Sequence, residues 1–166
     1  MQPDQPPAPD VPPPAEATGL FEGIDHVGYA VTDLDEAIRL HTEVLGWRLE
    51  HREVNAEQGV AEAMLVAGEG GPDRPRVQLL APLTGDSPVG RFLARSGPGV
   101  QQVAYRVRDI EQVSTVLRAR GLRLVHDRAV RGTGGSLVNF VHPRSTGGVL
   151  LEIVQPPGPP TGSGPS

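Results

Sequence analysis

Four polar side chains that can bind a metal ion stand alone on apolar segments of this 166-residue chain. They are His26, Gln78, Gln102 and Glu152. A buried polar group without a partner costs about 1–3 kcal/mol, and a single one on a strand is more often satisfied by the protein than used as a ligand. Four at equivalent positions of a repeated pattern instead favour one shared site, in which a divalent metal ion would satisfy all four donors.

These residues come into register because the chain repeats itself. Three pairs of segments match in the same order: 24–33 with 100–109, 46–51 with 121–126, and 77–80 with 151–154. The first pair sets His26 against Gln102, and the third sets Gln78 against Glu152. A duplicated unit that carries two donors in each copy predicts a site shared between the two halves.

Each copy predicts a strand, a helix and then three more strands. In the first copy, alternation places Tyr29 and Val31 toward the predicted helix and His26 on the other side of the strand. Helix caps are predicted at Asp33 and Asp109, and helix ends at Gly46 and Gly121. The expected strands are 24–31, 47–54, 59–66 and 76–81, and, after the opening strand of the second copy, 122–127, 136–141 and 148–155.

The predicted fold class is therefore α+β, with tandem βαβββ modules in a single domain over residues 21–155. Module one is expected at about 22–83, a linker helix at about 87–95, and module two at about 99–155. Residues 1–20 and 156–166 are rich in proline, which supports neither a helix nor a strand ladder. We expect both ends to be disordered tails.

Composition excludes several kinds of chemistry. The chain has no cysteine, and all 15 Lys+Arg residues are arginine, which removes thiol nucleophiles, sulfur-bound metals and Schiff-base lysines. The net charge of −5 argues against a nucleic-acid surface. No apolar run approaches the ~20 residues of a membrane span, and the start shows no secretory signal. We therefore expect a cytoplasmic protein with neither a nucleic-acid nor a membrane partner.

Several motifs resemble the vicinal-oxygen-chelate superfamily, in which paired βαβββ modules curl into a metal-binding cleft, and within it the methylmalonyl-CoA epimerases. The resemblance covers about residues 22–156. The matching segments are IDHVGYAV (24–31), LGWRLEHREVNAEQGVAEAM (45–64), VQLLAPL (77–83), AYRVRDI (104–110), GTGG (132–135), NFVHPRS (139–145) and GVLLEIVQ (148–155). Together, EQGVAEAM, VQLLAP and GTGG with NFVHP are more specific than the general module pattern.

The resemblance implies that the metal ligands are His26, Gln78, Gln102 and Glu152. Gln102 stands where the family has the second histidine of a His-His pair, so this chain departs from the pattern there. One nitrogen and three oxygen donors favour harder ions than a two-histidine site does. We expect Co²⁺ or Mn²⁺, with Mg²⁺ as a further alternative.

The activity that the resemblance implies is the epimerisation of methylmalonyl-CoA between its 2R and 2S forms through an enolate, with Glu62 and Glu152 as acid and base. The residues support Glu62 independently, because Val60 and Met64 share its face of the strand and an apolar setting raises a carboxyl pKa. Near residue 137, the equivalent place in module two is apolar. Further expected substrate contacts are Gly134, Gly135, Asn139, His142, Arg144 and Ser145. Relatives imply a homodimer.

Two other classes of function fit the same fold. A glyoxalase I-like lyase meets no objection from the ligands, whereas an extradiol dioxygenase needs two histidines and a carboxylate, which Gln78 and Gln102 argue against. A metal-free module that binds a drug, as bleomycin-resistance proteins do, is the non-enzymatic alternative. Metal content distinguishes that module from the enzymes.

Overall fold

A computed structural model of the protein describes residues 19–69 and 73–158. The predicted proline-rich tails, 1–20 and 156–166, lie outside the described residues except for 19, 20 and 156–158. In the described part of the chain the longest helix has 10 residues, and no helix has the length and apolar character needed to span a membrane.

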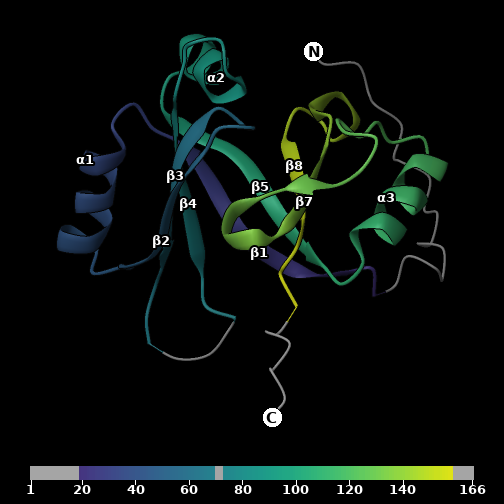
Figure 1. The fold of residues 1–166 in the computed structure, drawn as a ribbon, viewed down its shortest axis with the longest axis horizontal. Helices are drawn as coiled ribbons and strands as arrows, with labels where there is room; N and C mark the ends of the chain where they lie inside the picture. Colours follow the sequence, from purple (N-terminus) through teal and green to yellow (C-terminus); the bar gives the residue numbers. More distant parts are fainter. Residues whose placement is uncertain (1–18, 70–72, 159–166) are drawn as a thin grey trace, which may run out of the picture.

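One curled sheet of eight strands forms the framework of the protein (Figure 1). The strands are β1 (Phe21–Ala30), β2 (Arg48–Asn55), β3 (Val60–Val66), β4 (Arg76–Pro82), β5 (Gly99–Val107), β6 (Val130–Arg131), β7 (Leu137–Val141) and β8 (Leu150–Gln155). Their order across the sheet is β2-β3-β4-β1-β5-β8-β7-β6. Each half of this order comes from one copy of the repeat, so the predicted α+β fold of paired modules is confirmed.

The two modules join through the first strand of each. β1 and β5 pair antiparallel, while β1 pairs with β4 and β5 pairs with β8 in parallel. His26 lies opposite Ala104, and Gly28 lies opposite Gln102. Because these two pairs are equivalent in the repeat, an approximate twofold axis passes between β1 and β5.

Two β-bulges sit at equivalent places on these central strands. The pairing shifts between Ile24 and His26 on β1, which leaves Asp25 as the extra residue. It shifts again between Gly28 and Tyr29 relative to β5, where Gln101 is the extra residue. A bulge bends its strand and changes the direction of nearby side chains, and here both bulges directly precede a predicted ligand.

The helices lie where the capping residues predict them. α1 (Leu34–Arg39) and α3 (Ile110–Ala119) begin after Asp33 and Asp109, whose side chains accept hydrogen bonds from the backbone N–H three residues on, both at 2.9 Å. α1 continues as one π-helical turn over Leu40–Val44. α2 (Pro88–Ser96) is the predicted linker helix. Figure 1 shows α1 and α3 on opposite flanks of the sheet.

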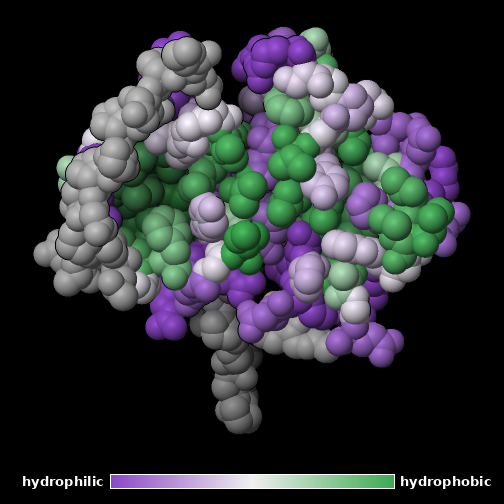
Figure 2. Space-filling model, turned by 180° about the vertical axis from the view of Figure 1, so that it is seen from behind, coloured by the Kyte–Doolittle hydropathy of each residue, from purple (hydrophilic) through white to green (hydrophobic). Residues whose placement is uncertain are grey.

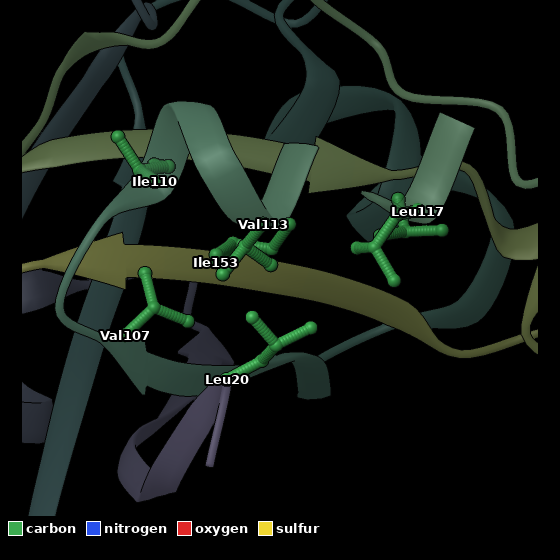
Figure 3. Packing of buried hydrophobic residues seen from close by; sticks show 7 residues of the cluster. Leu20, Val107, Ile110, Val113, Leu117 and Ile153 are labelled. Atoms are coloured by element: carbon green, nitrogen blue, oxygen red, sulfur yellow. The ribbon is translucent and has the colours of Figure 1, made fainter. Parts of the chain in front are cut away.

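Each flanking helix covers apolar residues on one face of its module. Figure 3 shows Val113 of α3 lying over Ile153 of β8. The same cluster includes Leu20, Val107, Ile110, Leu117 and Val141. Under α1, an equivalent cluster is formed by Leu34, Ala63, Leu65, Val77, Leu79 and Ala81. Side chains alternate along a strand, so the residues between these positions point to the opposite face of the sheet.

One predicted strand, 122–127, is wrong. This segment makes only an isolated bridge between Leu124 and Val141, and β6 is instead the two-residue strand Val130–Arg131. Beyond this bridge, side chains bind the backbone groups at the end of the segment. The Arg118 guanidinium donates to the carbonyl of His126 at 2.8 Å, and the Asn139 amide donates to the same carbonyl at 3.0 Å.

We expect Ile153→Ala to lower the free energy of unfolding by about 2–5 kcal/mol, because it opens a cavity in a cluster that cannot refill it. Ile153 is fully buried, whereas Val44, the last residue of the π-helical turn, is 72% exposed. Val44→Ala is the surface control and should change stability by about 0.5 kcal/mol or less. Urea unfolding of both variants checks this, and equal losses would contradict the assigned core.

Candidate functional site

The four predicted ligands meet in one buried ring. His26 Nε2 lies 3.1 Å from Gln78 Oε1 and 3.2 Å from Glu152 Oε2. Gln102 Nε2 donates to Gln78 Oε1 at 3.2 Å and to Glu152 Oε2. All four side chains are buried, and the contacts close on themselves. The structure therefore brings together residues that lie up to 126 positions apart (from 26 to 152).

Strand register explains the meeting. The ring residues come from four adjacent strands, β4, β1, β5 and β8, and all point to the face opposite the flanking helices. Gly28 lies opposite both Gln78 and Gln102. A Cβ atom on Gly28 would stand 2.5 Å from Cγ of Gln102, so the missing side chain makes room for one member of the ring.

The donor set fits a divalent metal ion. Two ligands at right angles around an ion with bonds of about 2.1–2.2 Å are about 3 Å apart, and the distances of 3.1 and 3.2 Å from His26 Nε2 to Gln78 Oε1 and Glu152 Oε2 agree with that spacing. Within residues 19–69 and 73–158, no group of three or more His, Cys, Asp or Glu is arranged as a metal site, since two ring donors are amides. The Gln102 amide would have to turn so that its oxygen faces the ring.

His26 is held from both sides. Its Nδ1 contacts Asp25 Oδ1 at 2.9 Å, while Nε2 faces Gln78 and Glu152. Burial alone would lower the pKa of His26, but the hydrogen bonds with Asp25 and Glu152 raise it to about 9. In the metal-free protein the imidazolium therefore supplies positive charge between two buried carboxylates.

Glu62 lies beside the ring on β3, one strand beyond Gln78. Its Oε2 accepts a hydrogen bond from Gln78 Nε2 at 2.8 Å, and its Oε1 accepts one from Thr133 Oγ1 at 2.7 Å. The side chain is buried. Burial raises the pKa of Glu62 to about 7, although the hydrogen bond from Thr133 lowers it; Glu53 and Glu152 add smaller upward contributions. A carboxyl group of this kind can exchange a proton near neutral pH.

A second carboxylate stands behind Glu62. Glu53 lies opposite Glu62 on β2, and the two carboxyl groups share a hydrogen bond. Burial would raise the pKa of Glu53, but its hydrogen bonds with His51 and Glu62 lower it. His51 Nε2 lies 2.8 Å from Glu53, and Gly134 N–H donates to it at 3.2 Å. The shared proton therefore resides on Glu62, next to the ring.

A cavity of about 330 Å³ opens onto the ring. Its walls include His26 and Glu152 from the ring, Met64, Arg76 and Gly134. A cavity of this size lies within the usual range for small-ligand sites, and it gives a ligand direct access to the ring.

The other predicted substrate contacts are not brought to this cavity, apart from the turn that holds Gly134 and Gly135. Asn139 is fully buried, and its amide binds the backbone of His126 at both ends, at 3.0 and 3.2 Å. His142, Arg144 and Ser145 lie in the turn after β7, where His142 caps Pro143–Ser145. Here their contacts are with the protein's own backbone, and the cavity lining does not include them.

Three polar residues at the site escaped sequence reasoning. Asp25 was hidden because neighbours along a strand normally point to opposite faces, and only the bulge places it beside His26. Thr133 lies in the GTGG motif (132–135), in which only the glycines Gly134 and Gly135 were predicted to contact the substrate. Glu53 lies in an edge strand between two exposed residues, Arg52 and Val54. Its position opposite Glu62 was the one signal that could have identified it.

Comparison with known proteins agrees with this geometry. A sequence profile of the Glyoxalase/Bleomycin resistance protein/Dioxygenase superfamily matches residues 25–140. The chain belongs to this superfamily. Its predicted resemblance to methylmalonyl-CoA epimerases is also confirmed, and with it the class of enzyme, an isomerase.

Three relatives carry this similarity within the superfamily. The crystal structure of methylmalonyl-CoA epimerase from Mycobacterium tuberculosis is 47% identical with a TM-score of 0.80, and the match covers 86% of this chain and 93% of that chain. A Streptomyces coelicolor methylmalonyl-CoA epimerase variant in complex with 2-nitronate-propionyl-CoA is 37% identical with a TM-score of 0.79, covering 83% and 99%. The mitochondrial methylmalonyl-CoA epimerase of Mus musculus is 32% identical over 121 residues, which are 72% of this chain and 65% of the mouse protein.

We expect Gly28→Ala to destabilise the protein by about 1–3 kcal/mol, the usual cost of overpacking a tight site, because the new Cβ displaces Gln102. Gly99→Ala is the control on the partner strand, since a Cβ atom there meets nothing within 4 Å. Urea unfolding compares the two variants. An unchanged Gly28→Ala protein would contradict the tight contact with Gln102.

Glu62→Gln should make the metal-free protein more stable at high pH than the parent chain. The folded pKa of Glu62 is about 7 against an ordinary value of 4.5, so its stabilising effect is complete below pH 4.5 and is lost as the pH rises through 7. The gain at pH 8 should approach 2–3 kcal/mol, from about 1.4 kcal/mol per pKa unit. Urea unfolding at pH 4.5 and pH 8 measures it.

Glu57→Gln, on the exposed turn between β2 and β3, controls for the loss of a carboxylate at the surface. It should show no comparable difference between pH 4.5 and pH 8. A Glu62→Gln protein whose stability follows the parent chain at both pH values would mean that Glu62 is not buried in a charge-excluding setting.

Proposed function

We propose that this protein interconverts the 2R and 2S forms of methylmalonyl-CoA. One observation carries the proposal: Glu62, a buried carboxyl group with a pKa raised to about 7, hydrogen-bonds to a ring of metal-type donors that opens into a cavity. Epimerisation at C2 needs a base near neutral pH. The relatives named as methylmalonyl-CoA epimerases add support from sequence and fold.

His26, Gln78, Gln102 and Glu152 are the proposed metal ligands. A bound divalent ion would act as a Lewis acid, favouring negative charge on the thioester oxygen and orienting the substrate through its carbonyl and carboxylate. The ligand set of one imidazole nitrogen and three oxygens supports Co²⁺ or Mn²⁺, with Mg²⁺ as an alternative. The distances of 3.1 and 3.2 Å from His26 Nε2 to the Gln78 and Glu152 oxygens are compatible with any of these ions.

Glu62 and Glu152 are the proposed acid and base. Across the sheet, the site residues follow the order Glu62 on β3, Gln78, His26, Gln102 and Glu152 on β8. The two carboxyl groups therefore stand at opposite ends of the site. One can remove the C2 proton from one face of the substrate while the other returns a proton to the opposite face, which is what inversion at C2 requires.

The environment of Glu62 suits this role in both directions. Thr133 and Gln78 donate to its two oxygens at 2.7 and 2.8 Å, which fixes the orientation of the carboxyl group. Burial raises its pKa, which makes it a stronger base than an exposed glutamate. Glu53 behind it disfavours a second negative charge and adds to this rise, and with a pKa of about 7 the protonated form is also populated at neutral pH and can act as the acid.

The competing functions fit the site less well. An iron dioxygenase needs two histidines and a carboxylate, whereas the ring holds one histidine, two glutamines and one glutamate. A drug-binding module does not require a carboxyl group of raised pKa beside a donor ring. A glyoxalase I-like lyase remains the second candidate, because its chemistry also needs a base beside a metal site.

A homodimer is the proposed assembly. Figure 2 shows apolar side chains gathered across the face opposite to that of Figure 1. Separately, an open groove is lined by Phe21 and Ile24 of β1, Tyr105 of β5 and Leu151 of β8, and Ile24 is 61% exposed. Exposed apolar surface of this kind is typical of protein interfaces. Sedimentation velocity at micromolar concentration tests the dimer directly.

The decisive experiment follows deuterium entering C2 of (2R)- or (2S)-methylmalonyl-CoA in D₂O with Mn²⁺ or Co²⁺. The parent protein should exchange this proton and interconvert the epimers. Glu62→Gln should lose at least about 100-fold in turnover, as expected for loss of a positioned acid–base group, while it still binds one equivalent of metal. Glu57→Gln should retain turnover. No exchange by the parent protein, or near-parental turnover in Glu62→Gln, would refute the proposal.

A further inference from the structure

Asp25 occupies an unusual place directly beside a ring residue. It is the extra residue of the β1 bulge, and it is buried. Without the bulge, Asp25 and His26 would point to opposite faces of the sheet. Instead the Asp25 carboxylate lies 2.9 Å from Nδ1 of His26, on the side of the imidazole away from Gln78 and Glu152.

We propose that Asp25 is the positioning residue of the site: it holds the proton of His26 on Nδ1 and thereby presents Nε2 to the ring as a metal ligand. This inference rests on the proposed metal site. An imidazole that binds a metal through one nitrogen commonly donates its other N–H to a carboxylate, which fixes the tautomer and the ring plane and makes the ligand more basic. Asp25 has the position and the distance for that contact.

Arg106 keeps the carboxylate in place. Its Nε donates to the second oxygen of Asp25 at 2.9 Å, and the guanidinium of Arg76 lies 3.9 Å from the first oxygen. A buried carboxylate is costly unless it is paired with a cation and hydrogen-bonded. Asp25 meets both conditions. Its carboxylate therefore stays charged, with Oδ2 bound to Arg106 and Oδ1 facing His26.

The second module provides an internal comparison. Its equivalent bulge carries Gln101 in place of Asp25 and is followed by Gln102 in place of His26. The repeat sets Ala30 at the position equivalent to Arg106, so a carboxylate at 101 would have no arginine partner there. Gln101 Oε1 is buried and makes no hydrogen bond within the described residues. Asp25 and His26 on β1, with Arg106 reaching them from β5, thus form one set that has no counterpart across the twofold axis, where Gln101, Gln102 and Ala30 hold the equivalent positions.

Metal affinity tests the inference without using catalysis. Isothermal titration of the metal-stripped protein with Mn²⁺ should give a dissociation constant about 10–100-fold weaker for Asp25→Asn than for the parent, the usual effect of losing such a partner. Asp73→Asn is the matched control, because Asp73 is the other carboxylate that binds Arg106, at 3.2 Å, and is 89% exposed. It should bind Mn²⁺ like the parent.

Proton NMR of the Zn²⁺-loaded parent gives a second readout. The Nδ1 proton of His26 should resonate downfield and exchange slowly, and Asp25→Ala should lose this signal. If the Asp25 variants do not fold, as judged by circular dichroism, the presence or absence of the signal in the parent decides the matter.

The outcomes separate this inference from the proposed function. Parental Mn²⁺ affinity in Asp25→Asn, or a Zn²⁺-loaded parent that lacks the Nδ1 signal, would overturn the role of Asp25 and leave the proposed activity standing. A parent protein that binds no divalent ion would overturn the proposed ligands and this inference together. Weaker binding in Asp25→Asn but not in Asp73→Asn supports it.

Discussion

The antiparallel pairing of β1 with β5 is the constraint on which the rest of the structure depends. It joins two modules, each too small to enclose a site, into one continuous sheet. The same register sets Gly28 opposite Gln102 and Ala104 opposite His26, so small residues face each long polar one. Shifting the register by one residue would turn every one of these side chains to the other face. The donor ring is thus a direct product of strand register.

Function is proposed where the two copies differ. The ring itself follows the approximate twofold axis, but the position equivalent to Glu62 holds the buried apolar Val138. Asp25 and Arg106 are likewise found on one side only. A symmetric scaffold can place donors evenly around a point, whereas inversion of a carbon centre requires two groups with distinct protonation states. In this chain the distinct environments arise at positions where the two copies carry different residues.

Sequence patterns predicted much of this structure, because alternation, helix caps and the repeat are local signals. They located the caps Asp33 and Asp109, most of the strands, and the four ring residues. They failed where tertiary contacts replace local ones. The segment 122–127 alternates like a strand, yet beyond one bridge the side chains of Arg118 and Asn139 bind its last carbonyls, those of His126 and Asp127. Asp25 was missed because side chains normally alternate between the two faces of a strand, and the bulge breaks this alternation at Asp25. The sequence of one strand does not predict where its register with the partner strand shifts.

The close approach of Gly28 to Gln102 means that the residue at either position limits which residues fit at the other. Ala104 of module two lies opposite His26, where there is room for its Cβ atom. The equivalent position in module one, residue 28 opposite Gln102, must be glycine because a Cβ atom there would clash with the glutamine side chain. Exchange of histidine for glutamine at the ring is therefore an epistatic change whose tolerance depends on residue 28. A side chain at position 28 and a glutamine at position 102 exclude each other in this register.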